Sequence, residues 1–147
     1  MPSLSEVLLA PENRAQVIAD CNQMIADEVS SKKGLTGLAV KAGFKAVRAF
    51  RPNIIESVID ALLEDFVTNL EPVFEAYKES NGNDLAAYCS KRSGDIADAL
   101  LAITDGRAQR SKLKTLVKAY EKLRPQGRKH VQEAVPRIAS LLTSHGL

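Results

Sequence analysis

The chain has 147 residues and a mass of 16.0 kDa, which is the size of one ordinary domain. Hydrophobic residues make up 45% of it, which excludes an intrinsically disordered protein. Charged residues make up 26%, but the net charge of +2 argues against a protein whose whole surface is built for nucleic acid. We therefore expect residues 1–147 to form a single domain.

Cysteine use and hydropathy bear on the cellular location. Cys21 and Cys89 form neither a disulfide framework nor a CxxC pair, so we expect two buried thiols. The first residues lack the basic start and long apolar run of a secretory signal. Lys41, Lys45 and Arg48 interrupt the most apolar stretch, which excludes a transmembrane helix there. The sequence predicts a cytoplasmic protein with no transmembrane segment.

Apolar residues recur at spacings of three and four along nearly the whole chain, which predicts an all-α fold. Ser3 and Glu6 fit a capping box for a short opening turn. Pro11 suits the first position of a second helix that runs to about Ser31. Gly34 follows two lysines and is suited to end that helix with a positive φ angle.

A third helix is expected over about residues 35–50, and little of its circumference is polar. Its three cations fall within a sector of roughly 60° at 100° per residue. Ala39, Ala42, Gly43 and Ala46 form a patch of small residues that allows a close helix neighbour. We expect this helix to be largely buried and central.

A fourth helix is expected over about residues 53–70, where the apolar stripe is almost unbroken, and Pro72 is expected to interrupt it. Asp105 with Gly106 is expected to end a later helix, and Pro136 to kink or split the last one. The predicted fold class is an all-α, single-domain helical bundle of six to eight helices, with residues 35–50 and 53–70 as its central pair.

Charge is segregated along the chain: the net charge is +2 over residues 1–51, −8 over residues 52–106 and +8 over residues 107–147. In one interpretation the basic end folds beside the acidic middle helices and is neutralised internally. The acidic residues considered are Glu56, Asp60, Glu64, Glu71, Glu75 and Glu79. In the other interpretation the basic end forms a patch for an anionic partner. The candidate patch residues are Arg107, Arg110, Lys114, Lys118, Lys122, Arg128 and Lys129.

The sequence offers no convincing catalytic, cofactor-binding or metal-binding set. The histidines are His130 and His145, and His130 with Glu133 puts only two ligand types on one helical face. Serine–lysine spacings occur without the companion motifs of acyl-transfer enzymes. We therefore expect no enzymatic activity, no metal and no cofactor.

Three segments resemble a family of small, uncharacterised all-helical proteins common in actinobacteria: Ser3–Pro11, Gly34–Arg48 and Ala99–Ala108. The resemblance spans nearly the whole chain. It implies a stand-alone bacterial domain and carries no assigned activity.

Three functions are consistent with these observations. The first is a non-enzymatic binding or interaction domain that meets a protein partner, or a second copy of itself, through charged helical faces. The second is non-specific binding of nucleic acid or of an anionic surface by the basic C-terminal helices; the absence of Trp and the small number of Tyr residues disfavour single-strand binding by stacking. The third is a carrier of a small apolar ligand held between helices.

Overall fold

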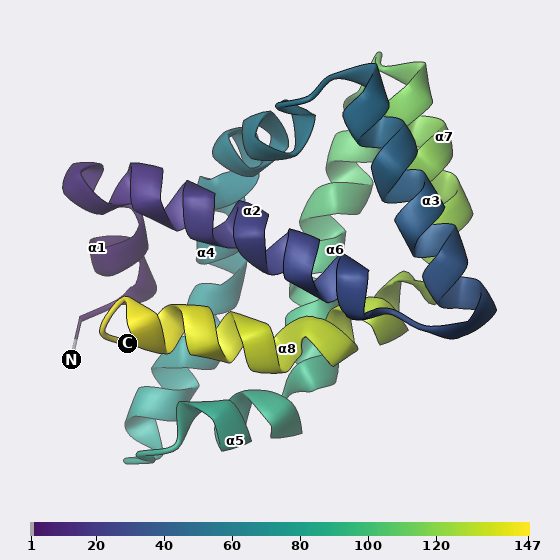
Figure 1. The fold of residues 1–147 in the computed structure, drawn as a ribbon. Coiled ribbons are helices and arrows are strands. Elements are labelled where there is room, and N and C mark those ends of the chain that lie inside the picture. The colour runs from purple at the N-terminus through teal and green to yellow at the C-terminus, as the bar shows by residue number, and fades with distance from the viewer. Residues whose placement is uncertain (1) are drawn as a thin grey trace.

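The computed structural model describes residues 2–147, and over this range the chain forms eight α-helices, one short 3₁₀-helix and no strand (Figure 1). This confirms the predicted all-α bundle. In chain order the elements are α1 (Leu4–Leu8), α2 (Pro11–Ser31), α3 (Gly34–Phe50), α4 (Ile54–Glu79), α5 (Leu85–Lys91), α6 (Ser93–Arg110), α7 (Lys114–Leu123), η1 (Arg124–Gln126) and α8 (Gly127–Ser144).

Local sequence signals set the first helix boundaries as expected. The Ser3 hydroxyl accepts a hydrogen bond of 3.1 Å from the Glu6 backbone N–H and so caps α1. Pro11 occupies the first turn of α2, where its missing N–H leaves no bond unmade. Gly34 has a φ of +75°, a conformation that costs a glycine little, and it lets the chain turn from α2 into α3.

The hydrophobic core lies where α4, α6 and α8 pack together, with α1, α2 and α5 against them. Leu63 and Val67 of α4 and Val135 of α8 are buried in it. Helix α1 is held to this core by Glu71 of α4, whose carboxylate accepts hydrogen bonds from the Leu4 and Ser5 backbone N–H groups at 2.9 and 3.1 Å. The acidic side chain therefore compensates the unpaired donors at the start of α1.

The expectation that residues 35–50 are central and paired with residues 53–70 is wrong. Helix α3 packs mainly against α7, and the two lie side by side at one edge of the molecule (Figure 1). Leu35 is 86% exposed and Leu38 is 63% exposed, so most of α3 is not buried. The central partners of α4 are instead α6, α1 and α2.

Two predicted helix interruptions are also wrong. Helix α4 continues through Pro72 to Glu79, and α6 continues through Gly106 to Arg110. Packing of both helices against neighbours on several sides outweighs the local cost of one proline or glycine. Helix α8 likewise contains Pro136 without being split. The extension of α6 places Arg107 within the helix rather than in a loop.

Candidate functional site

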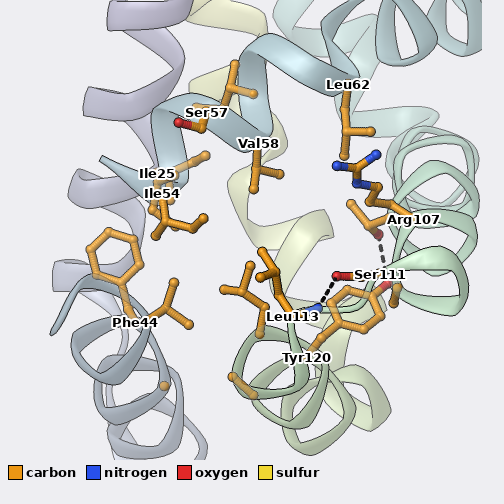
Figure 2. A pocket seen from close by; sticks show the side chains of 18 of the residues that line it. Ile25, Phe44, Ile54, Ser57, Val58, Leu62, Arg107, Ser111, Leu113 and Tyr120 are labelled. Atoms are coloured by element: carbon orange, nitrogen blue, oxygen red, sulfur yellow. Dashed lines mark hydrogen bonds between the residues drawn. The ribbon is translucent and has the colours of Figure 1, made fainter. Parts of the chain in front are cut away.

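An apolar cavity of about 470 Å³ lies between the α3–α7 pair and the helices α2, α4 and α6. Figure 2 shows Phe44 of α3, Ile25 of α2 and Ile54 of α4 on one side of it, facing Leu113 and Tyr120 on the other. The lining further includes Val29, Val40, Val47, Ile55, Val58, Leu62, Phe66, Leu116, Val117 and Leu123.

Helical spacing explains why these side chains meet. On α3 the lining residues Val40, Phe44 and Val47 are three and four positions apart, so they share one face. The lining residues of α4 and α7 follow the same spacing. Helix α3 therefore turns one apolar face toward α4, but the helices stay far enough apart to leave a hollow between them.

The close contact that α3 makes is with α7. A Cβ atom added at Gly43 would lie 3.1 Å from Leu123 Cδ1, so the glycine lets the two helices approach closely. Of the four residues in the predicted small-residue patch, Gly43 is the one that has the expected close helix neighbour. The other members of that patch, Ala39, Ala42 and Ala46, are exposed.

The polar groups beside the cavity are mostly satisfied by one another. The Tyr120 hydroxyl donates to the Asp105 carboxylate and shares a hydrogen bond of 2.7 Å with the Thr104 hydroxyl. Arg124 donates to both Asp105 carboxylate oxygens, at 2.8 and 3.0 Å. At the other end of the lining, the Ser111 hydroxyl accepts from the Leu113 N–H at 3.1 Å.

This network fixes the protonation states of its members. Hydrogen bonds from Arg124 hold the pKa of Asp105 below its ordinary value. Burial, followed by the hydrogen bond to Asp105, raises the pKa of Tyr120 to about 12. Tyr120 therefore stays a neutral hydrogen-bond donor at physiological pH.

Two arginines of the lining, Arg51 and Arg107, are the exceptions among these polar groups, because neither guanidinium makes a hydrogen bond or ion pair within residues 2–147. Arg107 is the one that α6 carries. The Arg107 side chain lines the cavity (Figure 2), and the residue is exposed. Within residues 2–147 its guanidinium makes no hydrogen bond or ion pair. It is thus a cation at the edge of an apolar hollow, with its donors available to a bound molecule.

The seven candidate patch residues lie on three helices. Arg107 and Arg110 lie at the end of α6, and Arg128 and Lys129 lie at the start of α8. Lys114, Lys118 and Lys122 are exposed on α7, on the side away from the cavity. We call these three residues the α7 lysine column.

Internal neutralisation occurs, but with different partners from those expected. Arg128 pairs with Asp98 of α6 at 2.9 Å, and Arg124 pairs with Asp105 of α6. The acidic residues of α4 point elsewhere: Asp60 and Glu64 pair with Arg14 of α2. Since α7 packs on α3 and α6 rather than on α4, the α7 lysine column makes no ion pair within the part of the chain that the structure describes.

The two histidines lie apart and contact different acids. His130 Nδ1 is 3.4 Å from Glu133 Oε1, and His145 Nε2 is 2.8 Å from Asp20 Oδ2. Among residues 2–147, no three His, Cys, Asp or Glu side chains are grouped so that they could hold a metal ion. Over the same residues, no helix has the length and apolar character needed to cross a bilayer.

Comparison with known proteins places the chain in a family. A family profile described as a family of unknown function, DUF6918, matches residues 4–146. The chain belongs to the DUF6918 family. Searches of curated proteins and of solved structures each gave no match. The expected membership of an uncharacterised family is thereby confirmed, and the DUF6918 family assigns no activity to the cavity or to the α7 lysine column.

The sequence is consistent with a ligand held between helices but does not identify the residues that line the cavity. The signal was present in α3, whose apolar residues occupy more of the circumference than packing against one neighbour requires. From the sequence alone this composition predicts a helix that is largely buried. A helix that faces a hollow on one side and solvent on the other has the same composition.

Proposed function

We propose that the protein binds a small apolar ligand in the cavity between the α3–α7 pair and the helices α2, α4 and α6. The cavity itself carries this proposal. Its volume of about 470 Å³ falls within the range of roughly 300–1,000 Å³ that is typical of small-molecule sites. Its walls are aliphatic and aromatic side chains from five helices, which favours a ligand that is mainly hydrocarbon.

The volume limits the size of the ligand. A cavity of roughly 150 Å³ admits benzene, which has six carbon atoms. A cavity about three times as large has room for roughly 18 carbon atoms by the same proportion. The availability of Arg51 and Arg107 in the lining favours a ligand whose hydrocarbon part ends in an anionic group such as a carboxylate.

The proposal is one of binding without catalysis. Burial raises the pKa of the Cys21 thiol to about 11 and raises the pKa of the Cys89 thiol, so both are poor nucleophiles at neutral pH. Tyr120, held by Asp105, is equally unsuited to act as a base. Two unpaired thiols are compatible with a reducing bacterial cytoplasm, which we propose as the location.

A second candidate is an interaction through charged helical faces, with a protein partner, with another copy of the chain or with nucleic acid. The observation in its favour is the exposed α7 lysine column, which has no internal partner among residues 2–147. Like charges at this spacing repel one another mildly, so an anionic partner would stabilise them.

Filling the cavity tests the first candidate. We expect Val58→Phe to weaken binding of the fluorescent apolar probe N-phenyl-1-naphthylamine, and of dodecanoate that displaces it, by at least about tenfold, because the added ring occupies the ligand's volume. Thr68→Phe adds the same ring at an exposed position on α4 and is the matched control. Probe fluorescence and circular dichroism report binding and folding.

A second variant, Ala119→Leu, fills the cavity from α7. If it also weakens probe binding, the effect of Val58→Phe is not due to a local distortion of α4. Equal probe binding by the parent and both filled variants would contradict the proposed site. Native mass spectrometry that shows only the bare polypeptide in excess dodecanoate would contradict ligand binding altogether.

The role of Arg107 gives a separate expectation. We expect Arg107→Gln to weaken dodecanoate about three- to tenfold and to leave dodecanol unchanged, because only the carboxylate makes a charge-assisted hydrogen bond. Arg110→Gln, which removes the same charge from α6 beside the cavity but not within its lining, is the control. Equal losses for dodecanoate and dodecanol would assign Arg107 a packing role instead.

A further inference from the structure

The outer side of α3 exposes apolar residues that no other part of residues 2–147 covers. Leu35 is 86% exposed, Leu38 is 63% exposed and Phe50 is 47% exposed. Between them lie the exposed Ala39, Ala42, Ala46 and Ala49. We call these seven residues the outer face of α3. Exposed leucines gathered with other apolar side chains on one helix face mark an interaction surface rather than an ordinary solvated one.

Helical geometry places this face away from the protein. At 100° per residue, the residues of the outer face fall within an arc of roughly 120°. The cavity-lining residues Val40, Phe44 and Val47 lie on the opposite arc. Lys41, Lys45 and Arg48 fill the sector of roughly 60° between the two arcs. Helix α3 thus presents a solvent-facing apolar arc with a basic border.

Helix α7 extends the positive charge beside this arc. It packs along α3, turns its own apolar face to the cavity and exposes the α7 lysine column on the opposite side. Together α3 and α7 hold six Lys or Arg residues and one acidic residue, Glu121. Since the whole chain has a net charge of only +2, the rest of the molecule is net negative. The positive charge is therefore concentrated on the side that carries the exposed leucines.

We propose that the outer face of α3 and the α7 lysine column dock together on an anionic lipid bilayer surface. Helices that lie in a membrane interface combine Leu and Phe on one face with Lys and Arg beside them. The apolar residues enter the boundary between headgroups and acyl chains, and each lysine near the anionic surface adds to the attraction.

The combination of features favours a lipid surface over the other anionic or apolar partners. A nucleic acid would bind the lysines through its phosphates, but Leu35 and Leu38 would stay exposed to water in that complex. A second copy docked through the same face would bring two basic borders together, which is repulsive. A bilayer with anionic headgroups matches the leucines and the lysines at once.

Vesicle flotation tests the docking. We expect the 147-residue chain to bind vesicles made of equal parts phosphatidylcholine and phosphatidylglycerol and to dissociate from them as the salt concentration rises. It should not bind vesicles of phosphatidylcholine alone. Leu35→Ser with Leu38→Ser should weaken binding by at least about tenfold without unfolding the protein, because both side chains are exposed.

Charge variants provide the matched comparison. Lys114→Gln with Lys118→Gln should also weaken binding by at least about tenfold. Lys91→Gln with Lys129→Gln removes two exposed charges from α5 and α8 and should change it little. Unchanged vesicle binding by the double leucine variant would overturn the proposal, as would binding of duplex DNA in place of vesicles.

Docking on a bilayer does not depend on the ligand proposed for the cavity, so an experiment can contradict either proposal without contradicting the other. Val58→Phe, which fills the cavity, should bind anionic vesicles as the parent does. The double leucine variant should still bind N-phenyl-1-naphthylamine, because neither leucine lines the cavity.

Discussion

Replacing Leu63 by alanine is expected to lower the free energy of unfolding by about 3 kcal/mol. Leu63 is 4% exposed and belongs to the core formed by α4, α8 and their neighbours, so its removal leaves a cavity that the surrounding helices fill only in part. Leu38→Ala is the matched control, because Leu38 is 63% exposed on α3. We expect its effect to stay within about 0.5 kcal/mol. Urea unfolding of both variants, with unchanged slopes, gives the comparison.

The comparison separates two assignments of the core. If α3 were central, Leu38 and Leu63 would contribute about equally to the free energy of unfolding. A loss for Leu38→Ala as large as that for Leu63→Ala would therefore contradict the arrangement in which α3 lies at the edge. A dependence of the Leu38→Ala loss on protein concentration would point to a second copy covering the outer face of α3 in solution.

Much of the fold follows from sequence because the core helices obey one rule. Helix α4 keeps apolar residues at spacings of three and four, and the buried Ile59, Leu62, Leu63 and Val67 lie on the predicted stripe. Such a stripe is buried wherever a helix has one apolar face and one core to cover. The helix ends at Ser3 and Pro11 depend on local chemistry alone and were equally predictable.

The place of α3 could not be predicted in the same way. Its apolar residues form two faces, and hydropathy does not distinguish a face that packs from one that lines a cavity or meets solvent. Gly43, against Leu123, settles the neighbour of α3 as α7, which is 80 positions further along the chain. Nothing in the composition of either segment specifies that pairing.

The net charge of each region also does not identify which charged residues form ion pairs. Residues 52–106 carry most of the acidic charge, but only side chains on adjoining helices pair: Asp98 and Asp105 of α6 reach the basic end, whereas Asp60 of α4 pairs with Arg14. Lys32 illustrates the same limit. At the end of α2 it fits a solvated cation near the helix dipole, yet the fold buries it to 8% exposure.

The burial of Lys32 makes it the second position of large expected effect. Its ammonium group donates to Glu133 at 3.2 Å and to the His130 carbonyl at 3.3 Å, and it lies 3.9 Å from Glu28. We expect Lys32→Met to lower the free energy of unfolding by about 2–3 kcal/mol, because the methionine keeps the aliphatic contacts but removes the lysine that Glu133 accepts from. Glu28 keeps a second cation, Arg137, at 3.6 Å. Lys33→Met, at the exposed neighbouring residue, is the control and should change the free energy of unfolding little.

The pH dependence of this loss identifies its electrostatic part. The hydrogen bond from Lys32 holds the pKa of Glu133 below its ordinary value, so the folded state binds its proton less readily than the unfolded state. The stabilisation is present above the unfolded pKa of about 4.3 and is lost as the pH falls through the folded pKa. The difference between the parent and Lys32→Met should therefore shrink in urea unfolding below about pH 4. A difference that stays constant down to the acid transition would mean that Lys32 acts through packing against its neighbours rather than through its charge.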